Sequence, residues 1–382
     1  MNETAPARGT RPRNRRALIV AAATSLFVER GYARVFMDDI ARELNVVPSS
    51  LYRHFTGKPA LLVAVIRSEF AFFIDVVAEG GTPTEVLRRF AACELDHRGL
   101  GVLWQREARN LPAEEQVGIR ADIRLLTSTL AALVSAERPG LSAREVDFIA
   151  AGVISAGVSV SFHHSTLPRN ELIDLLSGVM ARIFWLEAPV GEPMQVAAEP
   201  AAAGRREAVL AGAIELFAKR GFAATSVDDI GAAAGITGPT IYHHFSGKHE
   251  ILAAAIQSGM DDLWEAVRLS DRAGGGPKAM LEREVAAYTA FAVARPYSIR
   301  TLIAELDQLP LDERAVAVES QRRLVARWVK LQRAVTGDGE IVGRIRILAV
   351  TSVVNDLVQT SRLRSGPGFA SALTAVARSL VV

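Results

Sequence analysis

The sequence predicts an all-α protein built from two similar units in tandem. Apolar residues recur at helical spacing, and no run alternates apolar and polar residues as strands do. One block occurs twice, first from Arg15 to Leu62 and again from Arg205 to Leu252, at a constant offset of 190 residues. An internal repeat of this kind defines the domain organisation, so we expect two units with the same plan.

Each block divides into three short helices. Gly31 and Gly221 each follow a basic residue at the end of the first helix, which is typical of a helix C-cap. The Thr-Ser pair at 225–226 precedes Asp-Asp by three residues, which predicts a capping box at the second helix. Thr237 and Pro239 then predict the start of a third helix. A helix, a tight turn and a short polar helix form a helix-turn-helix, whose second helix enters the major groove of DNA.

Four short motifs occur in both copies in the same order and at the same spacing. In the first copy they are Arg30-Gly31-Tyr32, Met37-Asp38-Asp39-Ile40-Ala41, Leu51-Tyr52-Arg53-His54-Phe55 and Gly57-Lys58. Together they resemble the DNA-binding domain of TetR-type transcriptional regulators. The resemblance implies that each unit combines a three-helix DNA-binding domain with a helical body for ligand binding and dimerisation.

Breaks in the helical pattern set the expected domain boundaries. Residues 188–204 are rich in Ala, Pro and Gly and lack periodicity, which indicates a linker. After the glycine-rich break at residues 271–277 the offset between copies becomes 198, and we attribute the eight extra residues to that break. The predicted parts are a disordered basic arm at 1–14, helix-turn-helix domains at 15–62 and 205–252, regulatory bodies at 63–187 and 253–382, and the linker.

The last helices of both units carry dense apolar stripes, at residues 142–187 and 339–382. Two such helix pairs can bury their stripes against each other as a four-helix bundle. In TetR-type proteins the corresponding helices form the homodimer interface. The resemblance therefore implies an intrachain pseudo-dimer that needs no further oligomerisation.

Composition indicates a globular protein of the reducing cytosol. Apolar residues make up 49% and charged residues 23% of the 382 residues. The single cysteine, Cys93, excludes a disulfide framework and a cysteine zinc site. The N-terminus lacks the apolar segment of a signal peptide. The longest apolar run, residues 148–162, is shorter than a bilayer span, so we expect a buried interface helix, a cytoplasmic protein and no membrane contact.

Charge is distributed unevenly along the chain. The formal net charge is +2, yet residues 1–62 carry ten Lys and Arg against five acidic residues, and the second block is neutral. A basic first block favours a surface that binds nucleic acid, with the arm along the minor groove or phosphates. A basic tail that only maintains solubility is the alternative.

We expect double-stranded DNA to be contacted by the second and third helices of each block. Tyr52 and Tyr242 combine an apolar ring with a hydroxyl that can reach phosphate, although a core tyrosine is the alternative. Lys58 and Lys248 begin the next helix, where a cation is unfavourable unless it meets an anion such as phosphate. The expected DNA-binding residues are Arg15, Ser49, Ser50, Tyr52, Arg53, His54, Lys58, Thr225, Ser226, Thr237, Gly238, Pro239, Thr240, Tyr242, His243, His244 and Lys248.

The groove-facing residues differ between the copies, which predicts an asymmetric operator. Arg53 is the best candidate for bidentate recognition of guanine. The adjacent His243 and His244 do not suggest a metal site, because neighbouring residues on a helix point about 100° apart. Val47 and the Val-Phe pair at 35–36 replace threonine and serine of the second copy, so the first unit is expected to bind DNA more weakly or to rely on its extra charge.

The bodies are expected to hold an apolar effector. The resemblance extends to two-unit repressors of lipid- or steroid-uptake operons, which implies a repressor released by a lipid-like or acyl-CoA-like molecule. Charged residues at 106, 107 and 109 suggest a structural ion pair, with contact to the ligand as the alternative. The candidate pocket residues, for which ordinary core packing is the alternative, are Trp104, Phe148, Phe162, Tyr288, Phe291 and Tyr297, with Trp264 as a further aromatic candidate.

Two other classes of function are alternatives to the regulator. An enzyme is disfavoured because no glycine-rich phosphate loop, nucleophile elbow, paired carboxylates or metal-spaced His/Cys set occurs, and no cofactor or metal is expected. A helical adaptor that retains the fold with weak or one-sided DNA binding is the second alternative. A gel shift on the upstream DNA of this chain distinguishes both from a regulator.

Overall fold

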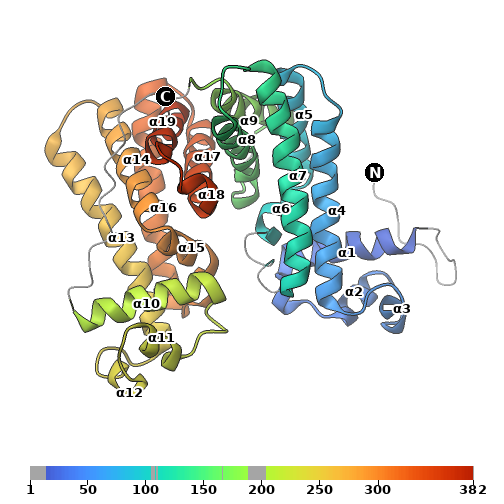
Figure 1. The fold of residues 1–382 in the computed structure, drawn as a ribbon, viewed down its shortest axis with the longest axis horizontal. Helices are drawn as coiled ribbons and strands as arrows, with labels where there is room; N and C mark the ends of the chain where they lie inside the picture. Colours follow the sequence, from blue (N-terminus) through green and yellow to red (C-terminus); the bar gives the residue numbers. More distant parts are fainter. Residues whose placement is uncertain (1–13, 105–107, 109–110, 166, 188–203, 382) are drawn as a thin grey trace. The chain divides into compact units, whose positions relative to one another are not determined.

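The computed structural model describes residues 14–104, 108, 111–165, 167–187 and 204–381 (Figure 1). Within these residues every regular element is helical and no strand occurs, which confirms the all-α prediction. All but the last residue of both the predicted basic arm and the predicted linker lie outside the described residues.

The helices follow the repeat. The first copy contains α1 (Arg15–Arg30), η1 (Tyr32–Arg34), α2 (Met37–Glu43), α3 (Ser49–Tyr52), α4 (Lys58–Ala78), α5 (Pro83–Asp96), α6 (Gly99–Val102), α7 (Ala113–Glu137), α8 (Ala143–Val158), η4 (Ser159–Phe162) and α9 (Arg169–Phe184). The second contains α10 (Arg205–Arg220), α11 (Val227–Ala233), α12 (Gly238–Ile241), α13 (Lys248–Ala273), α14 (Pro277–Ala294), α15 (Pro296–Glu305), η5 (Leu306–Gln308), α16 (Leu311–Thr336), α17 (Glu340–Gln359), α18 (Ser361–Arg364) and α19 (Phe369–Val381).

The chain forms two compact units whose boundary differs from that of the repeat. The first unit ends at Pro139 and also includes Val160–Phe162, whereas Gly140–Ser159 and the chain from His163 onward form the second. Helices α8 and α9 of the first copy therefore pack with the second copy.

Four helices of the second unit contact one another as a bundle. Helix α8 packs against α9 and α17, and α19 packs against α17 and α9. The rings of Phe148 and Phe369 meet edge to face at 6.0 Å between centroids. The Ser352 hydroxyl donates to the Ser155 carbonyl at 3.1 Å. The apolar stripes of the two copies are thus buried against each other, as the sequence predicts.

The segment Ala143–Phe162 is helical over 20 residues and is long and apolar enough to cross a membrane by length and composition. The expectation that this run is too short was wrong, because the helix begins before the apolar run does. More than half of its most apolar window is buried inside the protein, where it packs against α9 and α17. This packing is that of a core helix.

The eight extra residues of the second copy do not come from the glycine-rich break alone. Arg89 donates to the Gly80 carbonyl and Arg283 to the Gly274 carbonyl, so the offset there is 194. Helix α13 has 26 residues against 21 in α4, and α14 has 18 against 14 in α5. The single-site attribution was therefore wrong: the register changes before α14 and again after it.

An ion cluster fixes the far end of α13. The Arg327 guanidinium donates to Glu284 at 2.7 Å and to Asp271, the latter in α13, at 2.6 Å. The Trp328 indole also donates to Glu284, which is 2% exposed. These bonds raise the pKa of Arg327, chiefly through Glu284. A buried carboxylate is tolerated here because several donors replace its water.

Replacing Arg327 with Met should destabilise the second unit by about 3 kcal/mol, because Glu284 would remain buried without its main cation. Chemical denaturation followed by circular dichroism measures the change. The matched control is Arg322→Met, whose pair with Glu319 is exposed and should contribute less than about 1 kcal/mol. Equal midpoints for the two variants would show that the buried cluster is not stabilising.

Candidate nucleic-acid interface

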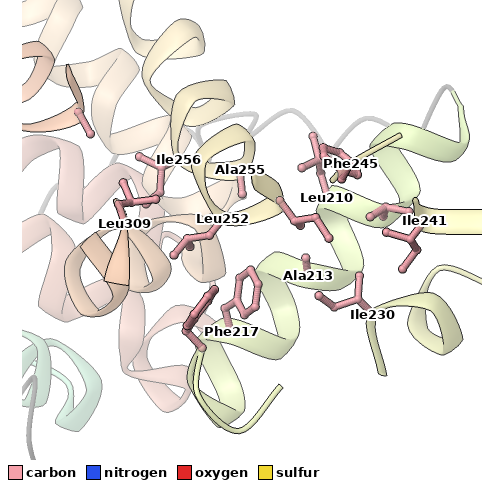
Figure 2. Close-up of a cluster of buried hydrophobic side chains, with 14 residues drawn as sticks. Leu210, Ala213, Phe217, Ile230, Ile241, Phe245, Leu252, Ala255, Ile256 and Leu309 are labelled. Carbon is pink, nitrogen blue, oxygen red and sulfur yellow. The ribbon is translucent and has the colours of Figure 1, made fainter. Parts of the chain in front are cut away.

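We call the two helix-turn-helix domains, at residues 15–62 and 205–252, the heads. Each head is held by an apolar core that its three helices share with the following long helix. In the second copy this core joins α10, α11 and α12 to α13, and it also includes Leu309 from the body (Figure 2). The equivalent side chains of the first copy are at most 8% exposed. The matched buried pairs are Ala23 with Ala213, Phe27 with Phe217, Ile40 with Ile230, Leu51 with Ile241, and Leu62 with Leu252.

Two backbone turns set the direction of the short helices. Gly31 and Gly221 end α1 and α10 with φ of 80° and 83°, which confirms the predicted glycine caps. The turn before the third helix also requires positive φ, at 52° for Asn45 and 68° for Gly235. Asparagine is among the few side chains that tolerate this region, so both copies make the same turn with different residues.

The second helix is capped fully in one copy and half in the other. In α11, Asp229 accepts from the Ser226 amide at 2.9 Å, and the Ser226 hydroxyl accepts from the Asp229 amide at 3.1 Å. In α2, Asp39 accepts from the Phe36 amide at 2.9 Å, but the phenylalanine ring cannot accept in return. The pKa of Asp229 is lowered by its bonds from Ser226, and that of Asp39 by the Phe36 amide.

Two capping expectations were wrong. Thr225 is 1% exposed and its hydroxyl donates to the Gly221 carbonyl at 2.8 Å, so it forms no box with Asp228 and is absent from the surface. Thr237 precedes α12 but makes no cap bond, because its hydroxyl pairs with that of Thr240 at 2.8 Å. Local side-chain partners compete with helix capping here.

The lysines at the start of α4 and α13 are held by the protein itself. Lys58 donates to the carbonyls of Tyr32 and Val35, both at 2.9 Å. Lys248 donates in the same way to Phe222 and Thr225, both at 2.7 Å. The ammonium groups also lie 4.2 Å and 4.3 Å from the centroids of the Tyr32 and Phe222 rings. The sequence predicts phosphate as the partner of these two lysines, because a cation at a helix start needs a negative group. Backbone carbonyl oxygens supply that group here.

The remaining predicted DNA contacts lie on the surface of the heads. Tyr52 and Tyr242 are 55% and 59% exposed, which excludes the core-tyrosine alternative. The exposed residues are Ser49, Arg53, His54, Ser226, Thr237, Pro239 and His243. The partly exposed residues are Arg15, Ser50, Lys58, Gly238, Thr240, His244 and Lys248.

The two heads differ in the chemistry of these surfaces. Phe36 and Val47 are 65% and 66% exposed in the first head. Ser226 and Thr237 occupy the equivalent positions of the second head. Thus the first head presents apolar side chains where the second presents hydroxyl groups.

The predicted pocket residues are distributed over both units. Trp104 and Phe162 belong to the first unit, and the others to the second. Phe148 lies in the helix bundle, and Tyr288 is buried with its hydroxyl donating to Asn355 at 2.7 Å. Burial raises the pKa of Tyr288. Phe291 is partly exposed and Tyr297 is exposed.

The ion pair expected among residues 106, 107 and 109 lies outside the described residues. One feature was not predicted from the sequence, a cation over an aromatic ring in each head. Arg16 lies 4.9 Å from the Phe55 centroid and Arg206 lies 4.7 Å from that of Phe245. Their common offset of 190 residues was a signal that could have revealed the pair.

Comparison with known proteins identifies the heads. The family model for bacterial regulatory proteins of the tetR family matches residues 19–65 and 209–255. These ranges cover the three helices of each head and the start of the following long helix.

The repressor KstR2 of Rhodococcus jostii is 40% identical over 79 residues, which cover 21% of this chain and 39% of that protein. The activator FasR of Mycolicibacterium smegmatis is 36% identical over 87 residues, covering 23% of this chain and 40% of that protein. The chain thus spans about two fifths of the length of these curated relatives.

Among solved structures, the ketosteroid transcriptional regulator KstR2 of Mycobacterium tuberculosis aligns with a TM-score of 0.41 and 23% identity. The alignment covers 47% of this chain and 93% of that one. The family matches coincide with both structural heads, and the chain therefore carries two DNA-binding domains of the tetR family of bacterial regulatory proteins, arranged in tandem.

Proposed function

We propose that the chain is a sequence-specific transcription regulator whose two unlike heads bind the two halves of one asymmetric operator. The observation that carries this proposal is the presence of two helix-turn-helix heads with exposed Tyr52 and Tyr242 at the ends of their third helices. The bundle of α8, α9, α17 and α19 supports an intrachain pseudo-dimer, because each copy contributes one helix pair to it. One chain then supplies both halves of the interface.

The regulator acts in the cytoplasm as a repressor that a small apolar molecule releases from DNA. The named relatives include the repressor KstR2 and the activator FasR, and one matched structure is titled as a ketosteroid regulator. These names support a lipid-like or acyl-CoA-like effector. A coupling free energy of about 1–3 kcal/mol between effector and operator is sufficient for such release.

The two heads contribute unequally to binding. The second head has a complete cap at Ser226 and a hydroxyl at Thr237, whereas the first has exposed Phe36 and Val47. The basic arm offsets this loss in the first head by adding charge near phosphate. The same apolar exposure favours, as a second candidate, an adaptor that binds DNA through the second head alone.

The operator should contain two half-sites of different sequence, because serine and arginine face one half while proline, threonine and histidine face the other. Footprinting of the full chain on its upstream DNA maps both halves. Replacing either half with an inverted copy of the other should lower affinity. A palindromic operator that binds equally well would contradict the proposal of two unlike reading heads.

Tyr242→Ala should weaken operator binding about fivefold, because one exposed hydrogen bond to phosphate contributes on the order of 1 kcal/mol. Tyr52→Ala should have a smaller effect if the first head binds weakly. Gel shifts with competitor DNA measure both, and Tyr297→Ala is the control for loss of an exposed tyrosine outside the heads. Unchanged binding in both head variants would count against the proposed interface.

Removing residues 1–14 should reduce the salt dependence of binding. The arm carries Arg8, Arg11 and Arg13, so the slope of log affinity against log salt should become shallower by about 2 to 3. Fluorescence anisotropy over a salt series gives this slope. A variant with glutamine at the three arginines should match the deletion, and an unchanged slope in both would show that the arm does not approach DNA.

A further inference from the structure

A surface groove of about 580 Å³ lies in the first unit beside the head. One mostly apolar face of α4 lines it, together with Glu115 and Asp122 of α7. Arg16, His54 and Phe55 line the end nearest α3. The α4 residues of the lining are Ala60, Val63, Ala64, Arg67, Ser68, Ala71 and Ile74. This volume falls within the range of about 300–1,000 Å³ for small-molecule sites.

The cations of the groove differ in their partners. Arg67 donates to Asp122 at 2.7 Å, and Glu115 acts on it as a second acid. Arg16 lies over the Phe55 ring and pairs with no carboxylate in the part of the chain that the structure describes. The lining thus carries two arginines and two acids, and of the two guanidinium groups only that of Arg67 is held in an ion pair among the described residues.

The second copy provides an internal comparison for this cation. Arg206 is the counterpart of Arg16 and lies over Phe245 in the same way. Glu250 occupies the position of Ala60 in the first copy. Hydrogen bonds from Ser246 are the largest cause of its lowered pKa, and the nearby charge of Arg206 lowers that pKa further. The acid that accompanies this arginine in the second copy is therefore missing from the first.

The two copies also differ in the side chains between their two long helices. Ile74 of α4 corresponds to Trp264 of α13 at the offset of 190 residues, and Asp122 of α7 corresponds to Ser320 of α16 at the offset of 198. The Trp264 indole donates to the Ser320 hydroxyl at 2.8 Å, so it spans from one helix to the other. In the second copy a protein side chain occupies the position that corresponds to the far end of the groove.

We propose that the groove of the first unit is a binding site for a small amphipathic anion. Its apolar body lies against the face of α4 between Ala60 and Ile74, and its acidic group lies beside Arg16. In the second copy, Trp264 takes the place of the apolar body and Glu250 that of the acidic group. This site is separate from the aromatic residues predicted to form a pocket, and the inference does not depend on DNA binding.

Two fluorescent probes of matched shape test the proposal on the full chain. 1-Anilinonaphthalene-8-sulfonate carries an anionic group on an apolar body, and N-phenyl-1-naphthylamine has the same rings without the sulfonate. The chain should bind the sulfonate saturably and more tightly than the neutral probe. Absence of saturable sulfonate binding, or equal affinity for both probes, would overturn the proposal.

Substitutions taken from the internal comparison locate the site. Ala60→Glu and Arg16→Gln should each raise the Kd of the sulfonate about three- to tenfold and leave the neutral probe unchanged, as expected for one charge contact near the surface. Ile74→Trp should weaken both probes by filling the groove. Arg206→Gln is the matched control and should change neither.

Circular dichroism verifies that each variant is folded, and Ala60→Glu introduces a residue that the second copy already carries at this position. If sulfonate binding is lost in the Arg206→Gln variant, or retained in all three groove variants, the site lies elsewhere and the proposal is wrong.

Discussion

The structure depends on burying each short-helix head against the long helix that follows it. Helices of four to seven residues do not persist alone, because nucleation costs more than a few hydrogen bonds return. Burial of Ile40 and Leu51, or of Ile230 and Ile241, supplies the missing free energy. The lysine at the start of the long helix adds two bonds to the preceding loop. The exposed faces are therefore presented by a rigid support.

A second constraint joins the two copies. Helices α8 and α9 pack with α17 and α19, so the last part of the first copy completes its core only with the second copy. A homodimer would form such an interface from two identical surfaces. Within one chain the two surfaces can differ in sequence. Two heads with different surface residues can therefore be joined to one helix bundle.

The copies differ at exposed positions of the heads and at partly buried positions of the long helices. Core pairs such as Phe27 and Phe217 are identical, whereas Phe36 and Ser226, or Ile74 and Trp264, differ in polarity or size. Exposed positions tolerate such changes because little packing energy depends on them. In the proposed function these positions face DNA or the proposed ligand, so divergence there would change recognition without changing architecture.

The sequence by itself determined the helical class, the repeat and the place of the heads, because glycine caps and apolar spacing act over a few residues. Only the tertiary structure decided that Lys58 and Lys248 meet carbonyls, that Thr225 is buried, and that α8 and α9 join the second unit. These outcomes depend on which groups the fold brings together from distant parts of the chain, and local patterns do not contain that information.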